Sequence, residues 1–318
     1  MVVGMARKPS QSRWSRSEYN LLHRSMLNKT DTTMAKIVCL LLLASLPLTC
    51  ASAAEVGGIQ AFSFGECRIV SIQDAPMKLP SRIFFDTSDS GRRPSGDFHE
   101  ASVNVFLVHS EGKVVLIDAG HAPERGSLRE KLHLLNVSPE EISDIFITHI
   151  HADHVGGLLW EGKPLFPKAV IHIARVEHDA WKKDASRSTL ARYLAPYTDR
   201  LHLFEYGETL PCGLVPEKRS GHTPGHTIFR MTLPGQQEAI FVGDIVHAVD
   251  IQFPQPTICA KYDESPADAV ISRIQTLQMD GILFGAHFPF PGAANGGATR
   301  QGSPGWSFAW KKYTDTSK

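Results

Sequence analysis

The chain has only five cysteines in 318 residues, and no Cys-x-x-Cys pair occurs among them. A disulfide-built fold, a cysteine zinc site and a dithiol redox centre are therefore disfavoured. An excess of basic charge is also missing, because 33 Lys and Arg residues balance 33 Asp and Glu residues. Residues 1–53 are basic overall and leave a mildly acidic remainder. We therefore expect no nucleic-acid partner and predict a small-molecule substrate instead.

Long apolar runs, linkers and repeats are missing too. The apolar run at residues 37–48 covers about 12 positions, whereas a membrane-spanning helix needs roughly 20. No Gly/Ser-rich or Pro-rich linker and no internal repeat divides the chain after residue 53. Residues 54–318 are therefore predicted to form a single domain, preceded by an N-terminal extension and signal peptide at residues 1–53.

The N-terminal segment has the pattern of an export signal. Residues 36–53 begin with a positive charge, continue with the apolar run and end in small residues up to Ala53. This order is typical of a secretory signal peptide, so we expect cleavage after Ala53 and an exported, periplasmic or secreted protein without a stable membrane anchor. Translation is expected to start at Met34, because the preceding residues show no apolar periodicity. Cys50 leaves a lipoprotein as the alternative.

Short apolar runs rich in β-branched residues recur along the rest of the chain and predict strands. Nine such runs stand at residues 67–72, 103–108, 114–118, 145–148, 169–174, 201–206, 228–233, 239–244 and 282–285. Helices are predicted from the leucine face at residues 128–135 and from the Ser-Pro pairs at residues 138 and 265. This alternation predicts two sheets covered by helices. Prolines and glycines interrupt residues 74–100, which we predict to be a long loop serving as a lid, an interface or a disordered segment.

A dense histidine motif directly follows one predicted strand. Residues 149–154 read His-Ile-His-Ala-Asp-His. Side chains two residues apart point the same way in an extended chain, so His149 and His151 can bind one ion. Asp153 and His154 fall at the turn into a helix and can face a second ion. Imidazole and carboxylate donors suit zinc, with cobalt, manganese or iron as alternatives.

This motif, with the two glycines that follow it, resembles the signature of the metallo-β-lactamase superfamily of metal-dependent hydrolases. Further segments resemble the superfamily's remaining elements in the same order, namely Asp118-Ala119-Gly120, the loop from Gly221 to Thr227, Gly243-Asp244 and Ala286-His287. The resemblance runs from about residue 67 to 290. It implies an α+β fold of the αββα four-layer sandwich type.

The resemblance also implies two divalent metal ions. Carried over onto this chain, the resemblance assigns a first ion to His149, His151 and His226. It assigns a second ion to Asp153, His154 and His287, and a bridging carboxylate to Asp244. Asp153 and Asp244 would hold a metal-bridging hydroxide that acts as the nucleophile. Asp118 would accept a hydrogen bond from a ligand histidine and so orient it. His222, four residues before His226, is expected to be structural or to orient a ligand.

The C-terminal half resembles the methyl parathion hydrolase and lactonase-like branch of the superfamily, through Asp244-Ile245-Val246-His247, Gln252-Phe253-Pro254, His287-Phe288-Pro289 and Trp306. The bridging Asp244 argues against the common zinc β-lactamases. The branch implies an aromatic substrate pocket, for which Trp181 is the main candidate and Phe84, Phe85 and Phe253 are further ones. An apolar mouth suits a neutral ester, lactone or phosphotriester.

The expected function is therefore that of an exported dinuclear metal-dependent hydrolase acting on an ester, lactone or phosphotriester. A β-lactamase or a glyoxalase-II-like thioesterase of the same fold is the alternative enzyme, and a zinc-binding or storage protein is the alternative outside catalysis. The complete ligand set disfavours storage, because storage needs metal affinity but no open bridging position. Self-association into a homodimer is left open.

Overall fold

The computed structural model describes residues 57–88, 96–184, 186–297 and Tyr313. Three features expected from the sequence lie outside these residues, namely the signal peptide at residues 36–53, the start at Met34 and the late motif at Trp306. Within the described ranges, none of the helices has the length and apolar character that crossing a membrane requires.

The first sheet has seven strands in the order β1-β2-β4-β5-β6-β9-β10. In that order they span Ile59–Phe64, Cys67–Pro80, Phe98–Ser110, Lys113–Ile117, Ile142–Phe146, Val170–Ala174 and Leu201–Phe204. The four strands from β1 to β5 pair antiparallel, and β5, β6, β9 and β10 pair parallel. The parallel strands β5 and β6 therefore end at the same edge of the sheet.

The second sheet has five strands in the order β11-β12-β13-β15-β16. They span Val215–Lys218, Thr227–Thr232, Glu238–Gly243, Ile282–Gly285 and Ala293–Asn295. β13 and β15 run parallel, and the other pairs are antiparallel. Two further pairs of strands form small ribbons. β3 (Phe84–Asp86) pairs with β14 (Ile258–Ala260), and β7 (Leu159–Trp160) pairs with β8 (Lys163–Pro164).

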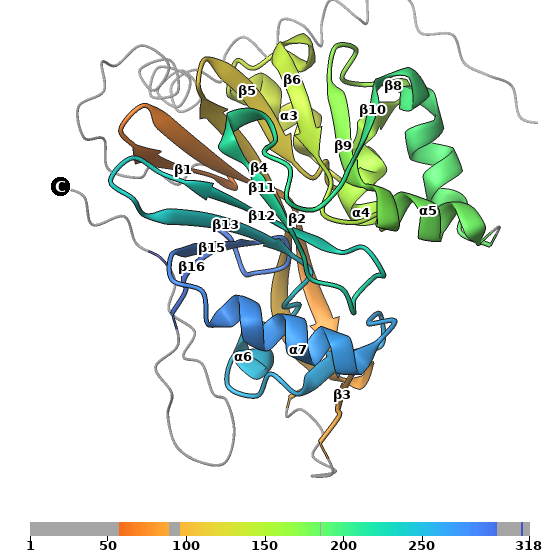
Figure 1. The fold of residues 1–318 in the computed structure, drawn as a ribbon, viewed down its shortest axis with the longest axis vertical. Coiled ribbons are helices and arrows are strands. Elements are labelled where there is room, and N and C mark those ends of the chain that lie inside the picture. The colour runs from red at the N-terminus through yellow and green to blue at the C-terminus, as the bar shows by residue number, and fades with distance from the viewer. Residues whose placement is uncertain (1–56, 89–95, 185, 298–312, 314–318) are drawn as a thin grey trace, which may run out of the picture. The chain divides into compact units, whose positions relative to one another are not determined.

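Helices cover the outer faces of both sheets (Figure 1). The α-helices α3 to α7 span Leu128–Leu134, Ala152–Val155, Arg175–Lys183, Val249–Gln252 and Pro266–Leu277. Short 3-10 turns stand at Ser81–Ile83 (η2), Pro139–Glu141 (η3), Gly156–Leu158 (η4), Ala195–Arg200 (η6) and Pro211–Gly213 (η7), and a π-helical turn stands at Leu190–Leu194 (η5).

The core is layered because successive side chains of a strand point to opposite faces. Phe106 of β4 packs between the sheets, where its ring lies 5.6 Å from that of Phe241 in β13. The neighbouring Leu107 points outward into the cluster that includes residues of α3. Ile240 likewise points outward and packs with Leu277 of α7. The order helix, sheet, sheet, helix is the αββα sandwich that the sequence predicts.

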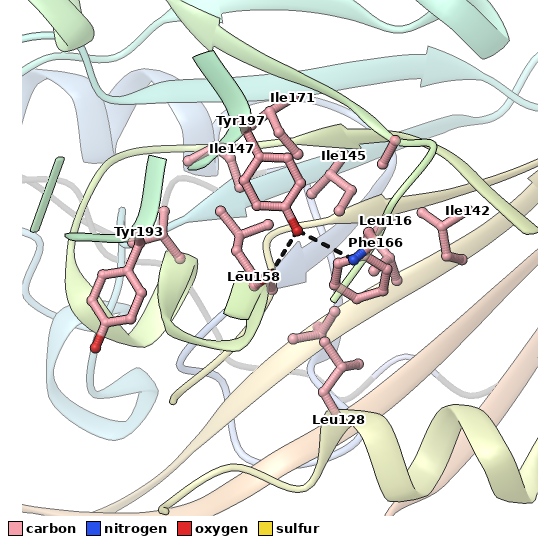
Figure 2. Packing of buried hydrophobic residues seen from close by; sticks show 14 of the residues in the cluster. Leu116, Leu128, Ile142, Ile145, Ile147, Leu158, Phe166, Ile171, Tyr193 and Tyr197 are labelled. Carbon is pink, nitrogen blue, oxygen red and sulfur yellow. Dashed lines mark hydrogen bonds between the residues drawn. The ribbon is translucent and has the colours of Figure 1, made fainter. Parts of the chain in front are cut away.

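One buried tyrosine anchors the chain that follows the histidine motif (Figure 2). The hydroxyl of Tyr197, in η6, donates a hydrogen bond to the carbonyl of Leu158 at 2.6 Å. It also accepts one from the backbone N–H of Phe166 at 3.2 Å. Leu158 ends the turn that the glycines of the histidine motif begin. Tyr197 thus holds the end of the loop that carries the histidine motif.

Each of the nine predicted strands coincides with a strand of the structure, but the predicted loop at residues 74–100 is largely wrong. β2 continues to Pro80 and β4 already begins at Phe98, and the two strands pair along this whole length. Prolines are tolerated here because β1 pairs with β2 only up to Ile72, which leaves the far part of β2 at an edge. The Ser-Pro pair at residue 265 opens α7, whereas the pair at residue 138 opens only the turn η3.

Candidate metal centre

The loops that carry the predicted site residues meet at one edge of the sandwich. β5, β6, β13 and β15 all end there and lead into Asp118, the motif at residues 149–154, Asp244 and His287. β12 runs antiparallel to β13, so the loop that precedes β12 lies at this edge as well. The backbone N–H of Thr227 donates to the carbonyl of Thr148 at 3.0 Å and joins the loops of the two sheets.

The first group of donor atoms holds three histidines and one carboxylate. The Nδ1 atom of His151 lies 2.9 Å from the Nε2 atom of His149 and 2.9 Å from that of His222. The Oδ2 atom of Asp244 lies 3.2 Å from the Nε2 atom of His222. A ring nitrogen carries at most one proton, so His151 can donate to only one of its two neighbours. A cation, in contrast, accepts a lone pair from all of these nitrogens.

The second group of donor atoms contacts the same carboxylate. The Oδ1 atom of Asp244 is 3.1 Å from the Nε2 atom of His154, and its Oδ2 atom is 3.1 Å from that of His287. Asp153 completes the group, with its Oδ2 atom 3.5 Å from the Nε2 atom of His287. Asp244 therefore stands between two sets of donors, as a carboxylate shared by two ions would.

The outer nitrogen of several of these histidines has a hydrogen-bond acceptor of its own. The Nδ1 atom of His154 lies 2.8 Å from Asp118 Oδ2, and that of His222 lies 3.0 Å from Asp263 Oδ1. The Nδ1 atom of His287 lies 2.9 Å from the carbonyl of Ser102. An outer N–H bonded in this way leaves the lone pair of Nε2 directed into the cluster. This is the tautomer that a metal ion requires.

Buried polar atoms test whether these residues fit a metal. The Nε2 atom of His154 and the Oδ1 atom of Asp244 are buried, and neither makes a hydrogen bond within the part of the chain that the structure describes. The two atoms lie 3.1 Å apart, and burial without a hydrogen bond costs free energy, which a metal ion in contact with both atoms would offset. Imidazole nitrogens with carboxylate oxygens are the donor set of zinc and related ions. The residues present therefore fit a divalent metal.

Charges within the cluster shift pKa values in opposite directions. Burial alone would raise the pKa of Asp244, but the neighbouring histidines, His287 foremost, hold it well below its usual range. Burial would lower the pKa of His154, but Asp244 and Asp118 raise it well above its usual value. Asp244 likewise raises the pKa of His222 to about 9 against the effect of burial. The shared carboxylate is thus ionised and attracts positive charge.

His226 lies outside both donor groups, contrary to the sequence-based assignment, and His222 stands in its place. The Nε2 atom of His226 accepts a hydrogen bond from the backbone N–H of Asp244 at 3.0 Å. The ring planes of His222 and His226 are turned 87° from each other, so the two rings serve different partners. His226 therefore supports the backbone of the shared carboxylate instead of joining the donor set.

Asp118 lies beside the second group of donor atoms. It accepts hydrogen bonds from His154 and from the backbone N–H of Thr148 at 2.8 Å. Its own φ of 59° lies in the left-handed region, where Asp is tolerated better than most residues. The following loop packs closely against Gly157, at which a Cβ atom would lie 2.1 Å from the carbonyl oxygen of Ala119.

The expected pocket residues are dispersed. Phe253 is 2% exposed and packs in the core, with its ring 5.7 Å from that of Phe288. Phe84 is buried in a separate apolar cluster, and its neighbour Phe85 is partly exposed. Trp181 is 5% exposed, and its ring lies 5.7 Å from that of His151. Of these four aromatic side chains, Trp181 is thus the one whose ring lies against a histidine of the donor groups.

Two further residues of the site were not assigned from the sequence. His247 lies three residues after Asp244, and its Nε2 atom is 3.3 Å from Asp244 Oδ2. Its ring stacks on that of His287, with centroids 5.5 Å apart. The spacing from Asp244 was a usable signal for His247. Asp263, which orients His222, follows β14 without any motif, so only the fold identifies it.

Comparison with known proteins places the chain in a family. A family model described as the Metallo-beta-lactamase superfamily matches residues 100–287, which is more than half of the chain. The chain therefore belongs to the metallo-β-lactamase superfamily. Ribonuclease Z of Nanoarchaeum equitans (strain Kin4-M) is 42% identical over 60 residues, which cover 19% of this chain and 17% of that protein. The match to this relative is thus local.

Solved structures share the fold over most of the chain. A hydrolase of the beta lactamase superfamily, AbOPH, has a TM-score of 0.69 at 25% identity and covers 82% of this chain and 99% of its own. AidC, a dizinc quorum-quenching lactonase solved with the product N-hexnoyl-L-homoserine, has a TM-score of 0.68 at 24% identity and covers 81% and 99%, respectively. These similarities confirm the fold predicted from the sequence.

Proposed function

We propose that the protein is a dinuclear metal-dependent hydrolase that cleaves an ester, a lactone or a phosphotriester. The observation that supports this most strongly is the position of Asp244, whose carboxylate lies within 3.2 Å of nitrogen donors from both groups. One ion would be held by His149, His151 and His222, and the other by Asp153, His154 and His287, with zinc as the expected metal.

Two divalent ions in these positions would supply a hydroxide nucleophile near neutral pH and polarise the attacked oxygen. The residues of the chain then have separate tasks. Asp118 and Asp263 hold the rings of His154 and His222 in one tautomer. His226 fixes the backbone of Asp244. Such prior positioning means that the groups need not reorganise when charge develops in the transition state.

The side chains around the cluster favour a substrate that carries an apolar group. His151 and Asp153 are only partly buried, so the cluster opens to solvent on their side. Tyr262 is 49% exposed, and its ring lies 6.0 Å from that of His247. An exposed aromatic ring beside the donors offers an apolar wall to an acyl chain or an aryl group. The lactonase AidC makes a lactone the first substrate to test.

The test is a panel of a lactone, an aryl ester, a phosphotriester, a thioester and a cephalosporin, assayed with metal-loaded protein. We expect hydrolysis of at least one of the first three and its loss after exhaustive chelation. Asp244→Asn should lower metal occupancy and reduce turnover of every active substrate by roughly 10²-fold or more. Two bound ions without hydrolysis of any compound would favour zinc storage, and activity that survives chelation would refute the proposal.

We also propose that the protein is exported, on the pattern of residues 36–53. N-terminal sequencing of protein expressed from Met34 should give a mature start at Ala54. Uncleaved protein in the cytosol would contradict export, and a lipid-modified Cys50 would establish the lipoprotein alternative.

A further inference from the structure

A buried carboxylate outside the donor groups connects the two histidine loops. Glu177, in α5, is 1% exposed. Its Oε1 atom accepts a hydrogen bond from the backbone N–H of Ile150 at 3.0 Å and one from Trp181 Nε1 at 2.7 Å. Its Oε2 atom accepts one from the backbone N–H of Gly225 at 2.8 Å. One side chain thus bonds two segments that are 75 residues apart in the sequence.

The two bonded backbone groups stand next to the donors of the first group. Ile150 lies between His149 and His151, and Gly225 lies three residues after His222. The first segment follows β6 of the seven-stranded sheet, and the second precedes β12 of the five-stranded sheet. The spacing between these histidines therefore depends on how the loops of two different sheets are held together.

The loop at Gly225 also rests directly on α5. A Cβ atom at Gly225 would lie 2.4 Å from the backbone nitrogen of Glu177 and 2.5 Å from its Cα atom. Only glycine allows this approach, which brings the loop within reach of the carboxylate. The bond between Thr227 and Thr148 joins the loops at the strand ends, whereas Glu177 joins them where the histidines project.

Burial of this carboxylate needs compensation. Burial raises the pKa of Glu177, and the hydrogen bonds from Ile150, Gly225 and Trp181 oppose that effect. A buried carboxylate is tolerated when its oxygens are satisfied by donors in good geometry. Two of these donors, the N–H groups of Ile150 and Gly225, come from the two loops, so the side chain is fully satisfied only when the loops hold their present separation.

We propose that Glu177 is a positioning residue that sets the distance between His222 and the pair His149 and His151, and thereby the affinity of the first metal site. This inference rests on the proposed metal-dependent function. Groups that only orient a metal ligand typically change metal affinity about 10- to 100-fold when they are removed.

The test is Co²⁺ binding to the full chain carrying Glu177→Gln, followed by visible absorption. The amide of Gln can accept with one oxygen only, so the N–H of at least one loop loses its acceptor. We expect Co²⁺ affinity at one of the two sites to fall about 10- to 100-fold and the absorption bands of that ion to change. Hydrogen exchange at Ile150 or Gly225 should become faster in the same variant.

Asp179→Asn is the matched control, because it makes the same chemical change on the same helix at a side chain that is 47% exposed. It should leave Co²⁺ affinity and absorption at wild-type values. Glu177→Asp keeps the charge but withdraws the carboxylate by about 1.5 Å, so it should bind Co²⁺ more tightly than Glu177→Gln and less tightly than wild type. This second variant tests the inference if Glu177→Gln does not fold.

Wild-type affinity and absorption in a folded Glu177→Gln or Glu177→Asp variant would overturn the inference. A lower melting temperature of the metal-free variant with unchanged Co²⁺ binding would also overturn it, because Glu177 would then stabilise the fold without positioning the site. Failure of the wild-type protein to bind Co²⁺ or Zn²⁺ would instead refute the proposed function on which the inference rests.

Discussion

At the scale of single residues, His222 and His226 show how surroundings decide chemistry. Both are buried histidines of one short loop, and both are close to Asp244. His222 faces the carboxylate side chain of Asp244, and its pKa is raised to about 9 although burial opposes this. His226 faces the backbone of Asp244, and burial lowers its pKa to about 3. The first thus directs its ring toward the donor cluster, and the second is a neutral hydrogen-bond acceptor.

Replacing His222 by alanine should therefore lower the metal content, whereas replacing His226 should lower the melting temperature. His222→Ala should lose one of two metal equivalents after dialysis, because a donor to the first ion is missing. His226→Ala should keep both equivalents but melt at a lower temperature, since the N–H of Asp244 loses its buried partner. Metal content by atomic emission and melting by calorimetry on the same samples check both. Metal loss in His226→Ala alone would restore the assignment made from the sequence.

At the scale of elements, loops that follow strands are held by side chains from helices. Tyr197 of η6 holds the turn after the histidine motif through the carbonyl of Leu158 and the N–H of Phe166 (Figure 2). Burial raises the pKa of this tyrosine to about 12, so it stays protonated and can donate at any physiological pH. Within the described residues, its hydroxyl bonds to the backbone of Leu158 and Phe166 and to no donor atom of the site. Its role is therefore to fix the loop.

Tyr197→Phe should lower the free energy of unfolding by about 1–3 kcal/mol, since the N–H of Phe166 is left without this acceptor. Urea denaturation of the metal-free protein measures the change. Tyr193→Phe is the control, because the hydroxyl of Tyr193 points away from this pair in Figure 2, and we expect a change within about 0.5 kcal/mol. Equal losses in both variants would contradict the assigned role of the Tyr197 hydroxyl.

At the scale of the whole molecule, metal binding, protonation and stability are linked. Without metal, Asp244 favours the protonated form of His222, whose raised pKa stabilises the fold below the unfolded value of 6.5. That stabilisation is lost as pH rises through about 9. A metal ion needs the deprotonated ring, so the ion and the proton compete for the same site.

The stabilisation that zinc gives should therefore grow with pH. Between pH 6 and about 8.5, metal affinity should rise by up to about tenfold per pH unit for each proton released. The difference in melting temperature between zinc-loaded and metal-free protein, followed across this range, measures the effect. Calorimetric titration in two buffers of different ionisation enthalpy counts the protons. A difference that shrinks as pH rises would contradict the linkage.

Much of the fold follows from local sequence. Strands such as β4 and β13 are buried on both faces, so they appear as nearly continuous apolar runs that local inspection finds. β1, β11 and β16 were missed because they are edge strands with weaker apolar patterns. The extension of β2 through its prolines was missed as well, since it depends on where β1 stops pairing.

The family and most of the grouped donor atoms follow from local sequence, because residues 149–154 concentrate metal-binding side chains in one turn. Tertiary structure decided between His222 and His226, since a loop with two similar histidines carries no local signal for which ring faces inward. That choice depends on Asp244 and Asp263, both distant in the chain. The role of Glu177 arises in the same way, because its partners in two sheets come together only when the sandwich is complete.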